Sequence, residues 1–183
     1  MSWKYKLEDA WNYIRRDIPN FFANIWRFRK ELRRHQWWDY SYTLELMLKS
    51  FQIIEKGLSE KGIEERTSLN KKLTKIRRVI HILETTIDDN WIEMAEEELG
   101  ELPPSTLFFE PLKDKPGLFE MKDKDTSEET ALRRKIFNRA NEIEEAYWKE
   151  LWEILEGQDY KAFNKEQPWD EQFNGSGLRG WWD

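Results

Sequence analysis

Apolar residues recur at intervals of three and four along most of the chain, which is the spacing of an amphipathic α-helix. The clearest run lies at about 65–87, with a 4-3-4-3-4 spacing: Leu69, Leu73, Ile76, Ile80, Leu83 and Ile87. A second run, at about 41–60, consists of Leu44, Leu48, Phe51, Ile54 and Leu58. Because a short connection with Gly62 joins the two segments, we expect an antiparallel helical hairpin, with the other helices built around it.

The first forty residues predict two further helices. Residues 4–16 carry Leu7, Trp11 and Ile14 at helical spacing. We expect Pro19 to end this helix, because the residue before a proline is disfavoured in the α region. Asn20 can then cap a second helix. The apolar stripe of that helix, which we expect to face a core, consists of Phe21, Ile25, Phe28 and Leu32.

A fifth helix and a change of character follow the hairpin. Asp88 or Asp89 is expected to cap a helix that runs through Leu99, and Gly100 suits the position after a helix end. Residues 101–126 then mix prolines with large apolar residues. This segment is too apolar for a free linker, so we expect an ordered loop packed on the helices, with a short β-hairpin as one form of it.

The last third of the chain predicts one long helix and an aromatic tail. Thr126-Ser127-Glu128-Glu129 is a capping box for a helix to about Glu156, whose apolar face is wide enough to imply burial on more than one side or an oligomer. The tail, residues 157–183, ends in Trp181-Trp182-Asp183, which suggests an anchor on this chain or on another copy. We therefore predict an all-α fold of about six helices, with one domain at 1–156, a Pro-rich loop at 101–126 and a tail at 157–183.

Composition narrows the class of protein. The chain has 11 Trp, 10 Phe and 6 Tyr, and such large rings can build a core although only 39% of residues are hydrophobic. It has no cysteine, which excludes disulfides, thiol catalysis and cysteine metal sites. No stretch reaches the ~20 apolar residues of a membrane span, and residues 1–6 lack the apolar core of a signal peptide. We expect a soluble, cytoplasmic protein without a membrane partner.

Charge is distributed unevenly. The net charge of −6 argues against a general nucleic-acid binder. Residues 15–34 are nevertheless strongly basic, whereas all the charged residues of 88–101 are aspartates and glutamates. The two regions could neutralise each other within the fold, or the basic region could face an anionic ligand. Both interpretations stay open at this point.

The sequence contains no recognisable catalytic or metal-binding signature. A ferritin-like di-iron site needs Glu-x-x-His pairs, but Leu32 and Arg78 stand three positions before the two histidines, His35 and His81. There is no Gly-rich phosphate loop, no Gly-x-Ser-x-Gly elbow and no zinc-ligand spacing. We therefore expect no metal, no cofactor and no enzyme activity, although helical carboxylates could still assemble a hydrolase site.

One cluster combines bases with aromatic rings. The basic end of the second helix leads directly into Trp37, Trp38 and Asp39, a natural N-cap. Arginine forks bind phosphates and aromatic faces stack on bases, which suits a nucleotide-like ligand. The candidate ligand-binding residues are Arg29, Arg33, His35, Trp38 and Tyr42, with Lys71, Arg77 and Arg78 if the third and fourth helices pair.

Structural roles explain the same residues equally well. The rings could be core residues, and the arginines could pair with the acids of 88–101. Bases near a helix C-terminus also suit the helix dipole, and a basic row on the fourth helix is usually a solvated face.

Several short motifs resemble a family of small, uncharacterised proteins carried by tailed bacteriophages. The motifs are Ile18-Pro19-Asn20-Phe21, Phe28-Arg29-Lys30-Glu31-Leu32, Trp38-Asp39-Tyr40, Lys71-Lys72, Arg77-Arg78-Val79-Ile80, Ala95-Glu96 and Leu99-Gly100. The resemblance covers roughly residues 18–100 and brings no assigned activity or binding residues. It implies expression inside a bacterial cell, where small phage proteins often inhibit host defence, some by sequestering nucleotide signals.

Three functions follow as hypotheses. The first is a non-enzymatic, phage-type binding protein that acts as an oligomer. It captures an anionic nucleotide-like molecule and so counters host defence signalling in the bacterial cytoplasm. The second is a protein–protein adaptor or inhibitor of a host protein that uses its aromatic surfaces and no small ligand. The third is a helical hydrolase.

Overall fold

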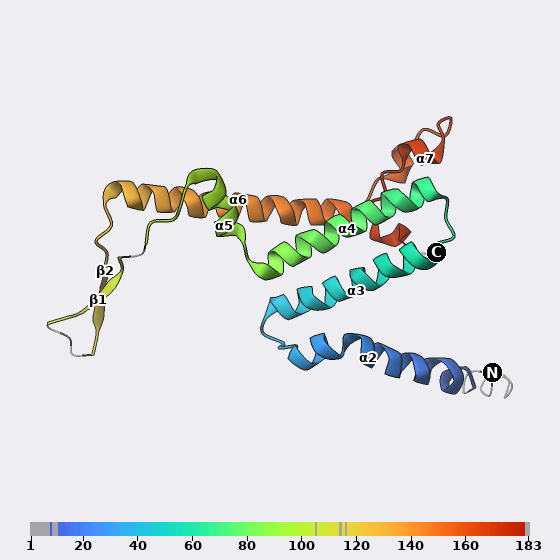
Figure 1. Ribbon diagram of the computed structural model, residues 1–183, viewed down its shortest axis with the longest axis horizontal. Helices are drawn as coiled ribbons and strands as arrows, with labels where there is room; N and C mark the ends of the chain where they lie inside the picture. The colour runs from blue at the N-terminus through green and yellow to red at the C-terminus, as the bar shows by residue number, and fades with distance from the viewer. Residues whose placement is uncertain (1–7, 9–10, 105, 114, 116, 182–183) are drawn as a thin grey trace. The chain divides into compact units, whose positions relative to one another are not determined.

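A computed structural model describes residues 8, 11–104, 106–113, 115 and 117–181. Within this part of the chain there are six α-helices and one two-stranded sheet (Figure 1). The predicted all-α class is therefore confirmed. Leu7 of the expected first helix and Trp182-Asp183 of the terminal motif lie outside the described residues.

The described elements differ from the expected ones mainly at their ends. The α-helices are α2 (Ile18–Arg34), α3 (Tyr40–Lys61), α4 (Arg66–Asp88), α5 (Trp91–Leu99), α6 (Ser127–Glu156) and α7 (Trp169–Gln172). A π-helix, η1 (Tyr13–Asp17), and two 3₁₀-helices, η2 (Tyr160–Ala162) and η3 (Leu178–Gly180), complete the helical elements. The strands are β1 (Phe108–Pro111) and β2 (Phe119–Lys122).

The chain divides into two compact units, which we describe separately. Unit 1 comprises residues 1–87 and 156–183, and unit 2 comprises residues 88–155. The predicted domain at 1–156 and the predicted tail at 157–183 stay predictions.

Pro19 does not end the first helix of unit 1, which corrects the expectation from the sequence. Ile18 keeps α-helical angles (φ −62°, ψ −51°), and the π-helix η1 leads directly into α2. In η1 the Ile18 N–H donates to Tyr13 O, five residues back. This wider turn moves the preceding carbonyls away from the proline ring, which would clash in a regular α-helix. Asn20 accordingly lies inside α2 and does not cap it.

The apolar stripe of α2 does not face a core. None of the residues of α2 is buried, and Phe21, Ile25 and Leu32 are exposed. α2 contacts α3 and lies at the outside of unit 1 (Figure 1). Of the stripe residues only Phe28 is half-buried, so the expected burial of the stripe is wrong for the single chain.

The core of unit 1 lies on α3 and α4. The fully buried residues of α4 include Ile76, Val79, Ile82 and Leu83, so the buried face includes the predicted stripe and extends beyond it. Figure 1 shows α3 and α4 running in opposite directions, and the Arg77 guanidinium lies 2.7 Å from the Glu55 carboxylate across the pair. The prediction that this pair organises the whole fold stays a prediction.

The aromatic tail docks within unit 1. The Lys71 ammonium of α4 donates to the backbone carbonyls of Asp170 and Phe173. Gly175 has φ +87°, and a Cβ there would collide with the backbone of Lys71, so this close approach requires glycine. Trp181 is 1% exposed. The sequence left open whether the tail docks on its own chain or on another copy. The described part of the tail docks on its own chain.

Unit 2 is built on the pairing of α5 with α6. Its buried cluster consists of Trp91, Ala95, Ile136, Ala140 and Ile143. Asn90, rather than Asp88 or Asp89, occupies the N-cap position of α5, because Asp89 has φ 54° and separates α4 from α5. The capping box of α6 is confirmed: Thr126 N donates to Glu129 Oε2 at 2.7 Å, and Glu129 N donates to Thr126 Oγ1 at 3.2 Å.

The Pro-rich segment of unit 2 contains an antiparallel hairpin of β1 and β2. Phe109 pairs with Met121 and Pro111 with Phe119, so these apolar residues share one face of the hairpin. Every residue of β2 is exposed. The expected packing against helices is therefore wrong for the hairpin, although Leu102, which precedes it, packs on the buried cluster.

Candidate functional site

The turn between α2 and α3 is fixed by Asp39. Its carboxylate accepts hydrogen bonds from Ser41 N at 2.9 Å and from Ser41 Oγ at 2.7 Å, so the predicted N-cap of α3 is confirmed. These two bonds favour the charged form and hold the pKa of Asp39 below its usual value. The turn therefore presents the residues before Asp39 in a defined direction.

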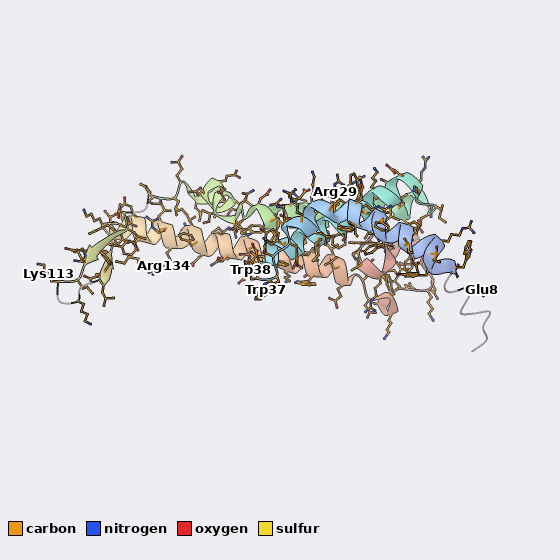
Figure 2. All side chains as sticks on the ribbon, turned by 90° about the horizontal axis from the view of Figure 1, so that it is seen from below. Glu8, Arg29, Trp37, Trp38, Lys113 and Arg134 are labelled. Carbon is orange, nitrogen blue, oxygen red and sulfur yellow. The ribbon has the colours of Figure 1, made fainter. Side chains whose placement is uncertain are left out.

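Two tryptophans project from this turn. Trp37 is 86% exposed, Trp38 is 67% exposed, and the rings meet edge to face with centroids 5.6 Å apart (Figure 2). The core role that the sequence left open for these rings is therefore excluded in the single chain. His35 and Tyr42 lie nearby with ring centroids 6.4 Å apart. The turn thus carries a solvent-exposed aromatic surface.

The last two turns of α2 form a basic hollow of about 500 Å³, lined among the described residues by Arg29, Lys30, Arg33 and Arg34. Arg34 is partly neutralised by Glu45 at 3.5 Å. Arg29 lies over the Trp26 ring, 4.0 Å from its centroid. Arg33 and Lys30 have no carboxylate within 4.0 Å among the described residues. Within the described part of the chain, no ion pair therefore competes with an external anion for these two side chains.

A second hollow, of about 480 Å³, lies between α2 and α3, and we call it the α2–α3 groove. Its lining residues are Trp26, Arg27, Arg29, Lys49, Ile53, Lys56, Gly57, Glu60 and Lys61. Lys56 has a weak ion pair with Glu60 at 3.8 Å. An added Cβ at Gly57 would meet no atom within 4 Å, so the groove is open beside this residue.

The candidate residues of the sequence do not form one site. Arg29 and Arg33 share the basic end of α2, and His35, Trp38 and Tyr42 lie at the turn that follows. The three α4 candidates have other contacts: Lys71 binds the tail carbonyls, Arg77 pairs with Glu55, and Arg78 has a partner as well. Whether any of these residues binds a ligand stays a prediction.

Sequence reasoning missed the bases that α3 contributes to the α2–α3 groove. Lys49, Ile53, Lys56 and Glu60 are spaced 4-3-4 along α3, so they lie on one side of that helix. This spacing is the sequence signal that could have identified the α3 side of the groove. The spacing identifies a common face of α3 but does not indicate that α2 lies beside that face.

The arrangement is suited to attracting an anion. Cations outnumber carboxylates by five to one along the α2–α3 groove within the described residues. The described part of the chain holds no group of three metal-ligating side chains. Clustered guanidinium and ammonium groups beside an indole ring attract phosphate and can stack on a planar base.

Comparisons with known proteins give no relative: no family model, no curated protein and no solved structure matches this chain. The resemblance to the phage proteins therefore stays a prediction. Among the described residues, none of the helices is both long and apolar enough to cross a bilayer.

Proposed function

We propose that this protein is a non-enzymatic binding protein that captures a small, phosphate-bearing, nucleotide-like molecule in the α2–α3 groove. The observation that supports this is the charge of the groove. Arg27, Arg29, Lys49, Lys56 and Lys61 surround it, with Glu60 as the one carboxylate among the described lining residues. Concentrating five cations in a protein with net charge −6 raises the local potential for anions.

The groove also offers a surface for a flat ring. Trp26 is 67% exposed although Arg29 lies over it. Base–aromatic stacking contributes roughly 1–3 kcal/mol, and charge-assisted hydrogen bonds about 1.5–3 kcal/mol each. A ligand that joins a phosphate to a planar base would use both kinds of contact. This chemistry is shared by linear and cyclic nucleotides.

If the resemblance to phage proteins holds, the ligand is a nucleotide signal of the host. The protein would then act in the bacterial cytoplasm, as an oligomer, and would counter host defence by removing the signal from solution. This biological role rests on the resemblance alone, whereas the chemical class of ligand rests on the groove.

The test is incubation of the protein with a panel of linear and cyclic nucleotides, followed by removal of free ligand and release of bound material by heat. Recovery of an intact nucleotide supports capture. A chemically changed nucleotide indicates a hydrolase, and the absence of any bound nucleotide contradicts the proposal.

A second candidate function is a protein–protein adaptor or inhibitor. The observation that favours it is the exposure of Trp37, Trp38 and the apolar hairpin face of Phe109 and Phe119. Such rings are enriched in the centres of protein interfaces. If this function is correct, the Trp37→Ala/Trp38→Ala double variant loses a protein partner while the nucleotide panel shows no binding to the wild type.

A further inference from the structure

α2 carries a helix-pairing pattern that the single chain leaves unused. Ile18, Phe21, Ile25, Phe28 and Leu32 follow one another at intervals of 3-4-3-4 within α2, and we call these five residues the α2 seam. This is the spacing with which two helices pack along each other. The seam of α4 has the same spacing and is buried or half-buried. In α2, Phe28 is half-buried and the other four are 36–59% exposed.

We propose that the α2 seam is a dimer interface whose occupant is the same seam of a second copy of this chain. A symmetric pair uses the same patch on both copies, so a self-complementary apolar stripe is sufficient to form it. The proposal is independent of the proposed ligand, because the α2–α3 groove lies on the basic side of α2.

The exposed apolar area of the seam supplies more than half of what a stable dimer needs. Phe22 flanks the seam and is 64% exposed. With a large ring presenting ~150–250 Å² when fully exposed, the seam and this ring present on the order of 500 Å² of apolar surface. Stable interfaces take about 800 Å² from each partner. α3, which contacts α2, supplies neighbouring surface in a four-helix arrangement.

The width of the stripe favours a protein occupant over a membrane. A basic amphipathic helix can lie on an anionic bilayer, and the local charge of α2 suits that alternative. The net charge of −6 on the whole chain opposes it. The narrow 3-4-3-4 stripe also matches a partner helix more closely than a flat apolar layer.

The test is sedimentation of the full chain at micromolar concentration, where the wild type should form a species twice the 22.4 kDa of one chain. Ile25→Asp, in the middle of the seam, should sediment as one chain with unchanged helical circular dichroism. The matched control is Ile63→Asp, because Ile63 is 89% exposed and lies outside α2. This control should remain a dimer.

A milder seam variant and a vesicle-binding measurement complete the test of the dimer interface. If Ile25→Asp loses its helical signal, Ile25→Ala replaces it and should weaken the dimer about tenfold or more. The inference is overturned if the wild type is a single chain, or if the seam variants dimerise as well as Ile63→Asp does. It is also overturned if the wild type stays a single chain in solution and binds vesicles of anionic phospholipid, because the occupant would then be a membrane.

Discussion

The indole of Trp181 packs edge-on against the ring of Phe51 in α3, with centroids 5.8 Å apart and an interplanar angle of 79°. Its Nε1–H donates to Gly175 O at 2.8 Å. A residue near the end of the chain thus fills the core of unit 1 and satisfies its one polar group there. The aromatic tail is therefore part of the fold.

Trp181→Ala should lower the free energy of unfolding by about 3–5 kcal/mol, because it removes a fully buried ring and leaves a cavity. Trp37→Ala is the matched control, since Trp37 is 86% exposed. Chemical denaturation of both variants measures the difference. Equal stability of the two variants would mean that the tail does not dock as described.

Gly175→Ala should destabilise the protein by more than about 1 kcal/mol, because the new Cβ meets the backbone of Lys71 and the residue must keep φ +87°. Gly117→Ala is the control that separates the steric clash from the backbone strain. Gly117 has a similar φ of +85°, but no atom lies within 4 Å of an added Cβ there. Thermal melts should show a clearly larger loss at position 175. A larger loss at position 117 would contradict the close approach.

Ile76→Ala should cost about 2–5 kcal/mol, because Ile76 is 0% exposed on the buried face of α4. Ile63→Ala, at a position that is mostly exposed, should change stability by less than about 0.5 kcal/mol. Urea denaturation compares the two variants. A loss at Ile76 as small as that at Ile63 would place the α4 stripe in solvent.

The capping box of α6 should make stability depend on pH. Hydrogen bonds from Thr126 N and Oγ1 lower the pKa of Glu129 below its usual 4.5. A carboxylate with a lowered pKa stabilises the fold above its unfolded-state pKa, and this contribution is lost as the pH falls through the lower, folded-state value. The stabilising effect should therefore be complete at neutral pH and decline progressively as the pH falls below about 4.5.

Glu129→Gln tests this dependence. It should lower the melting temperature at pH 7, and the difference from the wild type should vanish in acid. Glu128→Gln is the control, because this exposed neighbour has no hydrogen bond to Thr126 among the described contacts. A Glu129→Gln effect that stays constant from pH 7 to pH 3 would show that charge is not its cause.

Local signals predicted much of this structure. The N-cap at Asp39 and the capping box at Thr126 depend on residues that are adjacent in the sequence, and both were predictable. Burial of the α4 stripe could also be predicted, but the same spacing in α2 belongs to an exposed stripe. Periodicity identifies the apolar face of a helix, and it does not say whether a partner covers that face. Pro19 was misjudged because the π-helix before it has no simple sequence signal.

The candidate site was predictable only in part. Arg29 and Arg33 could be paired from the sequence because they are four residues apart on one helix. Lys49 and Lys56 could not be assigned to the site from the sequence, since their role depends on which side of α3 meets α2. Lys71 shows the converse: its position in a basic row suggested a ligand, but its ammonium holds tail carbonyls that lie about a hundred residues further along the chain.

Calorimetric titration of Arg29→Ala with the nucleotides that the wild type retains tests the binding proposal most directly. Arg29 lines both basic hollows, so its loss should weaken binding about tenfold or more, and added salt should weaken wild-type binding as well. Arg134→Ala, an exposed arginine of α6 (Figure 2), should bind like the wild type. If Arg29→Ala and Arg134→Ala bind equally well, or if no nucleotide binds the wild type, the α2–α3 groove is not a nucleotide site.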